Sequence, residues 1–166
     1  MILYPKTYIK RATEITVDFL RQHDIKALIL DVDNTVLNYE RVMLEGIEKW
    51  AEQMQEAGIK LCIVSNSNHE DKVKMASEKL GNIWYTNLAL KPFKKGFKKA
   101  IEYLNLPNEQ IAAVGDQIFT DVIGANRLNI YSILVEPIDE KDISITRIKR
   151  PLENWVINRY KRSKKK

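Results

Sequence analysis

Several features that would assign the 166-residue chain to other classes of protein are scarce or missing. The single cysteine, Cys62, excludes an internal disulfide and suits a core position in a reducing compartment. No apolar run approaches the roughly 18 residues that a membrane-spanning helix needs. The first residues lack the apolar stretch and cleavage site of a secretory signal, so we expect a cytoplasmic protein. No internal repeat and no interior linker rich in Pro, Gly or Ser divides the chain.

The composition is that of one globular domain, with 45% hydrophobic and 30% charged residues. The charge is unevenly placed. Residues 141–166 hold ten Lys and Arg against two acidic residues, a net charge of +8, so the other 140 residues carry −3. Such a basic terminus attracts polyanions: anionic lipid, nucleic acid or an acidic protein face. Its last six residues, 161–166, are low in complexity and are expected to be disordered.

Five apolar runs alternate with segments of helical periodicity. The runs are residues 26–31, 60–65, 82–85, 111–115 and 131–135, and the helical segments are 44–54, 68–80, 93–104 and 121–128. Continuous apolar strands indicate a parallel sheet that is covered on both faces. The alternation predicts an α/β domain with three α/β/α layers, Rossmann-like, around a five-stranded parallel sheet. Ligands of such sheets bind at the carboxyl ends of the strands.

Polar residues follow three of these strands, and one more lies in a neighbouring loop. They are Asp31 and Asp33 after the first strand, Ser65 and Asn66 after the second, Lys91 before the third helix, and Asp116 and Asp121 after the fourth strand. Each has an ordinary explanation by itself: a solvated turn, a helix cap or a surface charge. Together, four carboxylates at one sheet edge would repel one another strongly without a cation. Hard oxygen ligands favour Mg²⁺, which also pairs with a substrate phosphate.

The ordered set resembles the four motifs of the haloacid-dehalogenase-like (HAD) phosphohydrolase superfamily. The motifs are Asp31-Val-Asp-Asn-Thr35, Ser65, Lys91 and Gly115-Asp-x-x-x-x-Asp121, and the resemblance covers roughly residues 25–135. It implies the HAD fold and hydrolysis through an aspartyl phosphate. Dehalogenases of the superfamily lack an acid two positions after the nucleophile, so Asp33 indicates a phosphate ester as substrate.

The same resemblance implies roles for individual residues. Asp31 would be the nucleophile, Asp33 the general acid and then base, and Lys91 the cation that balances Asp31 and the phosphoryl oxygens. The expected substrate contacts are Ser65, Asn66 and Lys91. The expected Mg²⁺ ligands are Asp31, the backbone carbonyl of Asp33, Asp116 and Asp121, the last of which would hold the metal directly or through water, or orient Lys91.

The spacing of the motifs leaves no room for the cap domain that many relatives insert. Asp33 and Ser65 are 32 positions apart, and Ser65 and Lys91 are 26 apart, enough only for the expected helices and strands. The site is therefore expected to be open. Open sites of this superfamily usually serve large substrates, although some capless members form rings and take small sugar phosphates.

Apolar residues recur at helical spacing in the basic C-terminus, at Ile148, Leu152, Trp155, Val156, Ile157 and Tyr160. A basic amphipathic helix with Trp and Tyr suits an anionic membrane surface, and it equally suits a helix that docks on the sheet with its charges in water. We expect an N-terminal extension packed on the core over 1–24, the phosphatase core over 25–138, and the basic helix and disordered Lys-rich tail over 139–166.

The whole layout, with an N-terminal Pro-x-x-Tyr segment at 5–8 and a capless body, is similar to the YqeG-type class IIIA phosphatases of Gram-positive bacteria. That group resembles the mitochondrial phosphatidylglycerophosphate (PGP) phosphatases. The resemblance implies dephosphorylation of PGP to phosphatidylglycerol by a protein that is peripheral on the inner face of the membrane. Two alternatives remain: a soluble phosphatase of a nucleotide, sugar phosphate or phosphoprotein, and a nucleic-acid- or ribosome-associated module. The oligomeric state stays open.

Overall fold

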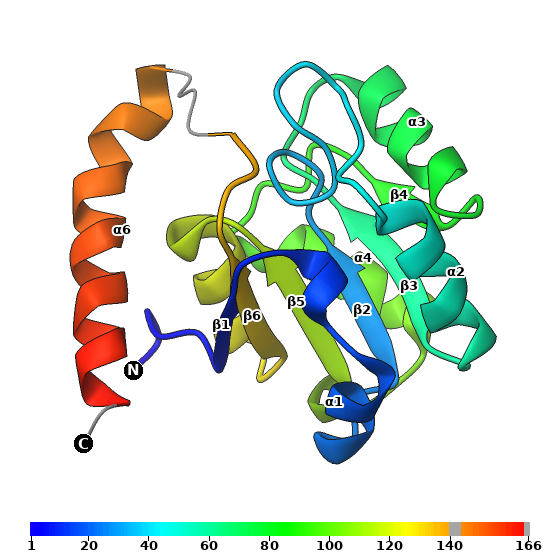
Figure 1. Ribbon diagram of the computed structural model, residues 1–166, viewed down its shortest axis with the longest axis horizontal. Coiled ribbons are helices and arrows are strands. Elements are labelled where there is room, and N and C mark those ends of the chain that lie inside the picture. Colours follow the sequence, from blue (N-terminus) through cyan, green and yellow to red (C-terminus); the bar gives the residue numbers. More distant parts are fainter. Residues whose placement is uncertain (140–143, 165–166) are drawn as a thin grey trace.

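Six parallel strands form one sheet in the computed structural model, which describes residues 1–139 and 144–164, without the side chains of 144–149 (Figure 1). The strands are β1 (Thr7–Ile9), β2 (Ala27–Leu30), β3 (Lys60–Val64), β4 (Trp84–Thr86), β5 (Ile111–Gly115) and β6 (Tyr131–Val135), in the spatial order β1-β6-β5-β2-β3-β4. All pairs are parallel. The predicted parallel α/β class is confirmed, with six strands in place of five.

The additional strand is β1, which lies in the segment expected to be an N-terminal extension. It pairs with β6 in the register Thr7–Ile133 to Ile9–Val135. The sequence did not predict β1 because the strand has only three residues, all half-buried, at an edge of the sheet. Such a strand has no continuous apolar run by which it could be recognised.

Helices cover both faces of the sheet. They are α1 (Val17–Gln22), α2 (Ile47–Glu56), α3 (Glu70–Lys79), α4 (Lys94–Leu104), α5 (Ile123–Asn126) and α6 (Ser144–Ser163), with the 3-10 helices η1 (Ala12–Glu14) and η2 (Asn108–Gln110) and the π-helical turn η3 (Ile118–Val122). The helix expected over 121–128 therefore begins three residues early, as η3. Between β2 and β3, and between β3 and β4, there is no inserted domain, as the motif spacing predicted.

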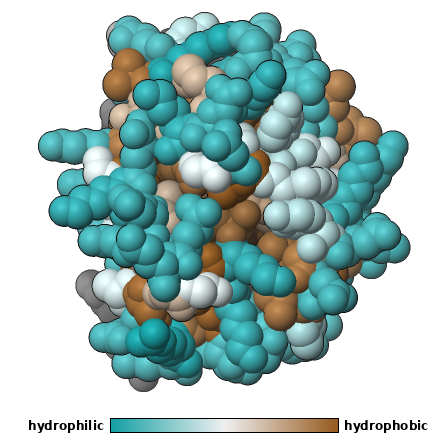
Figure 2. Space-filling view, turned by 90° about the vertical axis from the view of Figure 1, so that its right-hand side faces the viewer, coloured by the Kyte–Doolittle hydropathy of each residue, from teal (hydrophilic) through white to brown (hydrophobic). Residues whose placement is uncertain are grey.

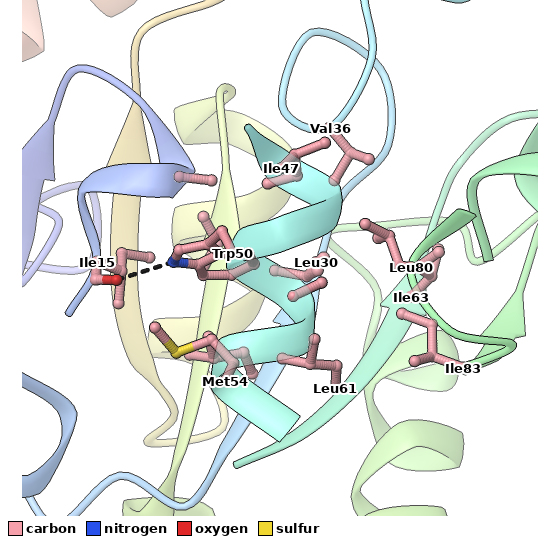
Figure 3. Packing of buried hydrophobic residues seen from close by; sticks show 14 of the residues in the cluster. Ile15, Leu30, Val36, Ile47, Trp50, Met54, Leu61, Ile63, Leu80 and Ile83 are labelled. Carbon is pink, nitrogen blue, oxygen red and sulfur yellow. Dashed lines mark hydrogen bonds between the residues drawn. The ribbon is translucent and has the colours of Figure 1, made fainter. Parts of the chain in front are cut away.

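Alternate side chains of the central strands enter two separate cores. On one face, Leu28 and Leu30 pack with Trp50 of α2, whose Nε1 donates a hydrogen bond of 2.8 Å to the carbonyl of Ile15 (Figure 3). On the other face, Ile29 packs with Phe97 of α4. The period of two along each strand thus produces the three layers and fixes the sheet between them. The side that carries α3 and β4 is largely hydrophilic, with hydrophobic side chains gathered in a central hollow (Figure 2).

The C-terminal helix α6 docks on the body through one face. Val156 is fully buried in a small cluster that includes Ile118 and Leu134. Tyr160 is 8% exposed, and its ring meets that of Tyr4 edge to face at 5.8 Å. Trp155, on another face, is half-exposed. Residues 161–163, expected to be disordered, form the last turn of α6, and the N–H of Lys164 donates to the carbonyl of Tyr160 at 3.2 Å. Residues 165–166 of the predicted tail lie outside the described residues. No described helix is long and apolar enough to cross a bilayer.

Candidate active site

The carboxyl ends of the central strands meet at one edge of the sheet, at the top of Figure 1. Asp31 directly follows β2 and extends its pairing with β5, because its backbone N–H donates to the carbonyl of Val114 at 2.9 Å. Ser65 follows β3, and Asp116 follows β5. Residues that are far apart in the sequence therefore lie around one point, as the parallel topology requires.

Lys91 joins two of the predicted carboxylates. Its Nζ lies 2.8 Å from Oδ1 of Asp31 and 2.6 Å from Oδ1 of Asp121. All three residues are less than a tenth exposed. Burial by itself lowers the pKa of Lys91, but the attraction of Asp121 and Asp31 outweighs it and raises the pKa above its usual value. Lys91 is therefore a fixed ammonium group beside the predicted nucleophile.

Asp31, Asp116 and Asp121 form a carboxylate cluster, with one oxygen of each within 4.8 Å of the others. Burial raises the pKa of Asp31 to about 7; the attraction of Lys91 opposes this shift, and the repulsion of Asp121 and Asp33 adds to it. Burial and the charges of Asp31 and Asp121 also raise the pKa of Asp116 well above its usual range. When all three carboxylates are ionised, the cluster carries more negative charge than the single ammonium of Lys91 neutralises.

The cluster also has an oxygen without a partner. Oδ1 of Asp116 is buried and accepts no hydrogen bond from the described residues. Buried polar atoms are normally paired, and unpaired ones need an explanation such as an ion. Three carboxylates that converge on one point are the hard oxygen donors that Mg²⁺ prefers. The residues present therefore fit the predicted magnesium ion.

Asp33 pairs with a residue outside this cluster. Its carboxylate accepts from Nζ of Lys72, on α3, at 2.5 Å, and its side chain is 46% exposed. The carboxylate of Asp33 is thus not part of the carboxylate cluster, and its backbone carbonyl is left as the predicted metal contact. No sequence signal distinguishes Lys72, which is one of three lysines on α3.

Ser65 and Asn66 occupy the turn after β3. Ser65 is fully buried, and its Oγ accepts from the backbone N–H of Ser67 at 3.1 Å, so the hydroxyl can still donate its proton. The side-chain amide of Asn66 donates to the carbonyl of Lys91 at 3.0 Å and accepts from the N–H of Lys91 at 2.7 Å. Asn66 therefore positions the Lys91 loop, and its expected contact with substrate stays a prediction.

The surroundings of Gly115 explain why the fourth motif begins with glycine. A Cβ at this position would lie 2.2 Å from Cγ of Asp121. The same carboxylate is held by the N–H of Gln117, which donates to Oδ2 at 3.2 Å. Gly115 thus makes room for a buried carboxylate that in turn holds Lys91.

The C-terminal helix reaches the site, which sequence reasoning had not foreseen. Oε1 of Glu153 accepts from the backbone N–H groups of Ile118 and Phe119, at 3.0 and 3.4 Å, on the turn that separates Asp116 from Asp121. A pocket of about 250 Å³ lies between α6 and the body, and Asp116 is one of its lining residues. The C-terminal helix therefore contacts the fourth motif directly, although it lies outside residues 25–138, which were expected to form the phosphatase core.

Comparison with known proteins identifies the family to which the chain belongs. Residues 1–138 match the family described as mitochondrial PGP phosphatase. The chain belongs to this family. It is 38% identical over 159 residues to "Probable phosphatase YqeG" of Bacillus subtilis (strain 168), an overlap of 95% of this chain and 91% of that protein. This confirms the predicted membership of the YqeG-type HAD phosphatases.

Two further proteins are less similar in sequence to this member of the PGP phosphatase family. The ribulose-1,5-bisphosphate 5-phosphatase of Halopiger xanaduensis is 27% identical over 144 residues, which cover 81% of this chain and 59% of that protein. The crystal structure of a HAD phosphatase from Thermococcus onnurineus has a TM-score of 0.62 at 14% identity, over 72% of this chain and 90% of that one. The structural likeness shows the HAD fold. With the family match, it makes the chain a HAD-type phosphatase.

Proposed function

We propose that this phosphatase removes the terminal phosphate of PGP at a membrane surface, through an aspartyl phosphate on Asp31. The observation that supports this chemistry best is the environment of Asp31: a buried carboxylate 2.8 Å from the ammonium of Lys91 and grouped with two further carboxylates. A cation at that cluster would hold a phosphoryl group against Asp31. Asp33 follows two residues later, outside the cluster, where it can serve as acid and base.

The reaction has two halves. In the first, an oxygen of Asp31 attacks phosphorus, the bond from phosphorus to the ester oxygen breaks, and Asp33 gives that oxygen a proton. In the second, water gives a proton to Asp33 and attacks the aspartyl phosphate, which releases phosphate and restores the carboxylate of Asp31. Lys91 and the hydroxyl of Ser65 donate to the phosphoryl oxygens throughout. A bound Mg²⁺, held by Asp31 and Asp116, would supply positive charge for those oxygens.

PGP as the substrate is supported by the family match over residues 1–138 and by the absence of an inserted cap in the described core. A lipid phosphate must enter a site while its acyl chains stay in the bilayer, which a closed cap would prevent. The excess of Lys and Arg in residues 141–166 favours an anionic surface. A phospholipid-synthesis role at the inner face of the membrane follows from this proposal.

A soluble sugar phosphate is the second candidate. The relative from Halopiger xanaduensis is described as a phosphatase of ribulose-1,5-bisphosphate, and the pocket beside Asp116 has room for a small polar group. This reading needs no membrane.

A substrate panel with Mg²⁺ decides between the two candidates. It should contain PGP in mixed micelles, ribulose bisphosphate, other sugar phosphates and nucleotides, with the Asp31→Asn variant as the blank. We expect the highest kcat/KM on PGP. An equal or higher kcat/KM on a soluble sugar phosphate would contradict the lipid assignment, and turnover in EDTA would contradict the metal assignment.

A further inference from the structure

Exposed apolar side chains lie on two loops that follow strands at the catalytic edge of the sheet. Ten large hydrophobic residues are exposed in the described part of the chain, and five of them lie on two short stretches, 39–42 and 88–93. These five, the apolar rim, are Tyr39, Val42, Leu88, Leu90 and Phe93, each 57–66% exposed. Clustered apolar side chains on a water-facing surface mark an interaction site, whereas scattered ones do not.

The two stretches flank the catalytic edge of the sheet. Residues 39–42 belong to the loop after β2, and residues 88–93 to the loop after β4 that carries Lys91. Both stretches contact the chain that follows β3: Arg41 pairs with Asp71, in the first turn of α3, at 2.6 Å, and the N–H of Leu88 donates to the carbonyl of Ser67 at 3.1 Å. These loops lie together at the top of Figure 1.

The backbone holds two of the leucines outward at a conformational cost. Leu88 and Leu90 have φ angles of +49° and +56°, in the left-handed region that bulky residues rarely adopt. Between them, Ala89 is buried and its N–H donates to the carbonyl of Ser65 at 2.9 Å. The chain is thus anchored at its middle residue while both neighbouring leucines project into solvent. Strain of this kind at the edge of a site suggests that the outward leucines have a use.

Positive charge adjoins the rim. Phe93 is followed on α4 by four exposed lysines, at positions 94, 95, 98 and 99. The first turn of α4 contains no acidic residue, so the positive end of the helix dipole repels the charges of Lys94 and Lys95. This arrangement disfavours the isolated helix and favours an anionic neighbour. Apolar side chains beside lysines match an anionic bilayer, whose interface is apolar beneath a layer of negative headgroups.

We infer that the apolar rim is the surface by which the enzyme inserts into an anionic membrane. Leu88, Leu90 and Phe93 enter the boundary of the acyl chains, and the lysines of α4 lie among the headgroups. The inference rests on the proposed function, because it brings the mouth of the site to the surface from which a lipid phosphate must arrive. It assigns membrane contact to the loops of the core, whereas the sequence had offered the C-terminal helix for this contact and equally for docking on the sheet.

Vesicle flotation of the full chain tests this assignment. The probes are vesicles of phosphatidylcholine alone and of phosphatidylcholine mixed with phosphatidylglycerol, and binding is expected only to the mixed vesicles. Leu88→Ser and Leu90→Ser should each lower the partition coefficient by about tenfold or more. Leu152→Ser, which changes a similarly exposed leucine on α6, is the matched control and should bind as wild type does.

Three outcomes would overturn the inference: no binding of wild type to the mixed vesicles, equal binding by the rim variants, or a loss in Leu152→Ser that matches theirs. Val42→Ser, on the other loop, provides a variant remote from Lys91 in case the leucine variants fold poorly, which thermal melting reports. The proposed function is judged separately by the wild-type substrate panel. Hydrolysis of PGP without rim-dependent binding would reject only the inference, whereas rim-dependent binding without hydrolysis of PGP would reject only the substrate.

Discussion

Asparagine in place of Asp31 should abolish turnover and at the same time stabilise the metal-free protein. Burial raises the pKa of Asp31 to about 7 from an ordinary value of 3.8. Between about pH 4 and pH 7 the folded protein therefore keeps a proton that the unfolded chain has released. The folded state binds more protons than the unfolded state in this window, so the free energy of unfolding falls as the pH rises.

The size of the effect follows from that shift. A difference of about 3 pKa units corresponds to an upper limit of about 4 kcal/mol at a pH above 7. Asparagine cannot ionise, yet its side-chain oxygen can still accept from Lys91. The Asp31→Asn variant should therefore be more stable than wild type by up to about 4 kcal/mol at about pH 8 in EDTA, and similar to it at about pH 4.

Urea unfolding followed by tryptophan fluorescence, at both pH values and with EDTA or Mg²⁺, measures this difference. Lys91→Met is the control of opposite sign, because it removes the ammonium that faces Asp31 and Asp121, and it should lower stability at about pH 8. Mg²⁺ should stabilise wild type more than Asp31→Asn, since the variant lacks one metal ligand. The reasoning is refuted if Asp31→Asn is the less stable protein at about pH 8 without metal, or if its advantage does not change with pH.

Three further predictions concern the neighbouring residues. Asp33→Asn should lose turnover, and it should accumulate aspartyl phosphate only from an aryl phosphate, whose leaving group needs no proton; phosphate labelling followed by acid quench would detect this, and continued turnover would exclude Asp33 as the acid and base. Gly115→Ala should lower the free energy of unfolding by about 1–3 kcal/mol, because its Cβ would collide with Asp121, and unchanged urea melting would contradict that contact. Asn66→Ala should cost about 1–3 kcal/mol and lower kcat more than it raises KM, because it frees both backbone groups of Lys91. A rise in KM alone would instead favour direct contact of Asn66 with substrate.

Much of the fold could be predicted because buried parallel strands appear in a sequence as continuous apolar runs. The runs at 26–31, 60–65, 111–115 and 131–135 have continuous apolar interiors, with Ser132 as the one interior polar residue, since both faces of each strand are covered. The same logic failed for β1, where three half-buried residues at an edge carry no such mark. It also missed the early start of the helix after β5, because a π-helical turn has no distinct apolar period.

The site likewise contains residues that the sequence predicted and residues that it did not. The motif residues Asp31, Lys91, Asp116 and Asp121 were predicted in advance because their order and their places at strand ends are properties of the sequence. Their partners were not: Lys72, Glu153 and the Asn66–Lys91 hydrogen bonds join segments that are remote along the chain. No periodicity or motif links such pairs, so only the packing of α3 and α6 against the core reveals them.

By itself, the sequence determined the parallel sheet, the missing cap and the identity of the residues that meet at its edge, because these depend on hydrophobic period, loop length and residue type. Tertiary structure alone decided the distances that make those residues a site, the turn of the Asp33 side chain towards Lys72, and the outward aim of Leu88 and Leu90. These depend on how separate elements pack in space. Their energies come from burial and charge between segments that the order of residues does not bring together.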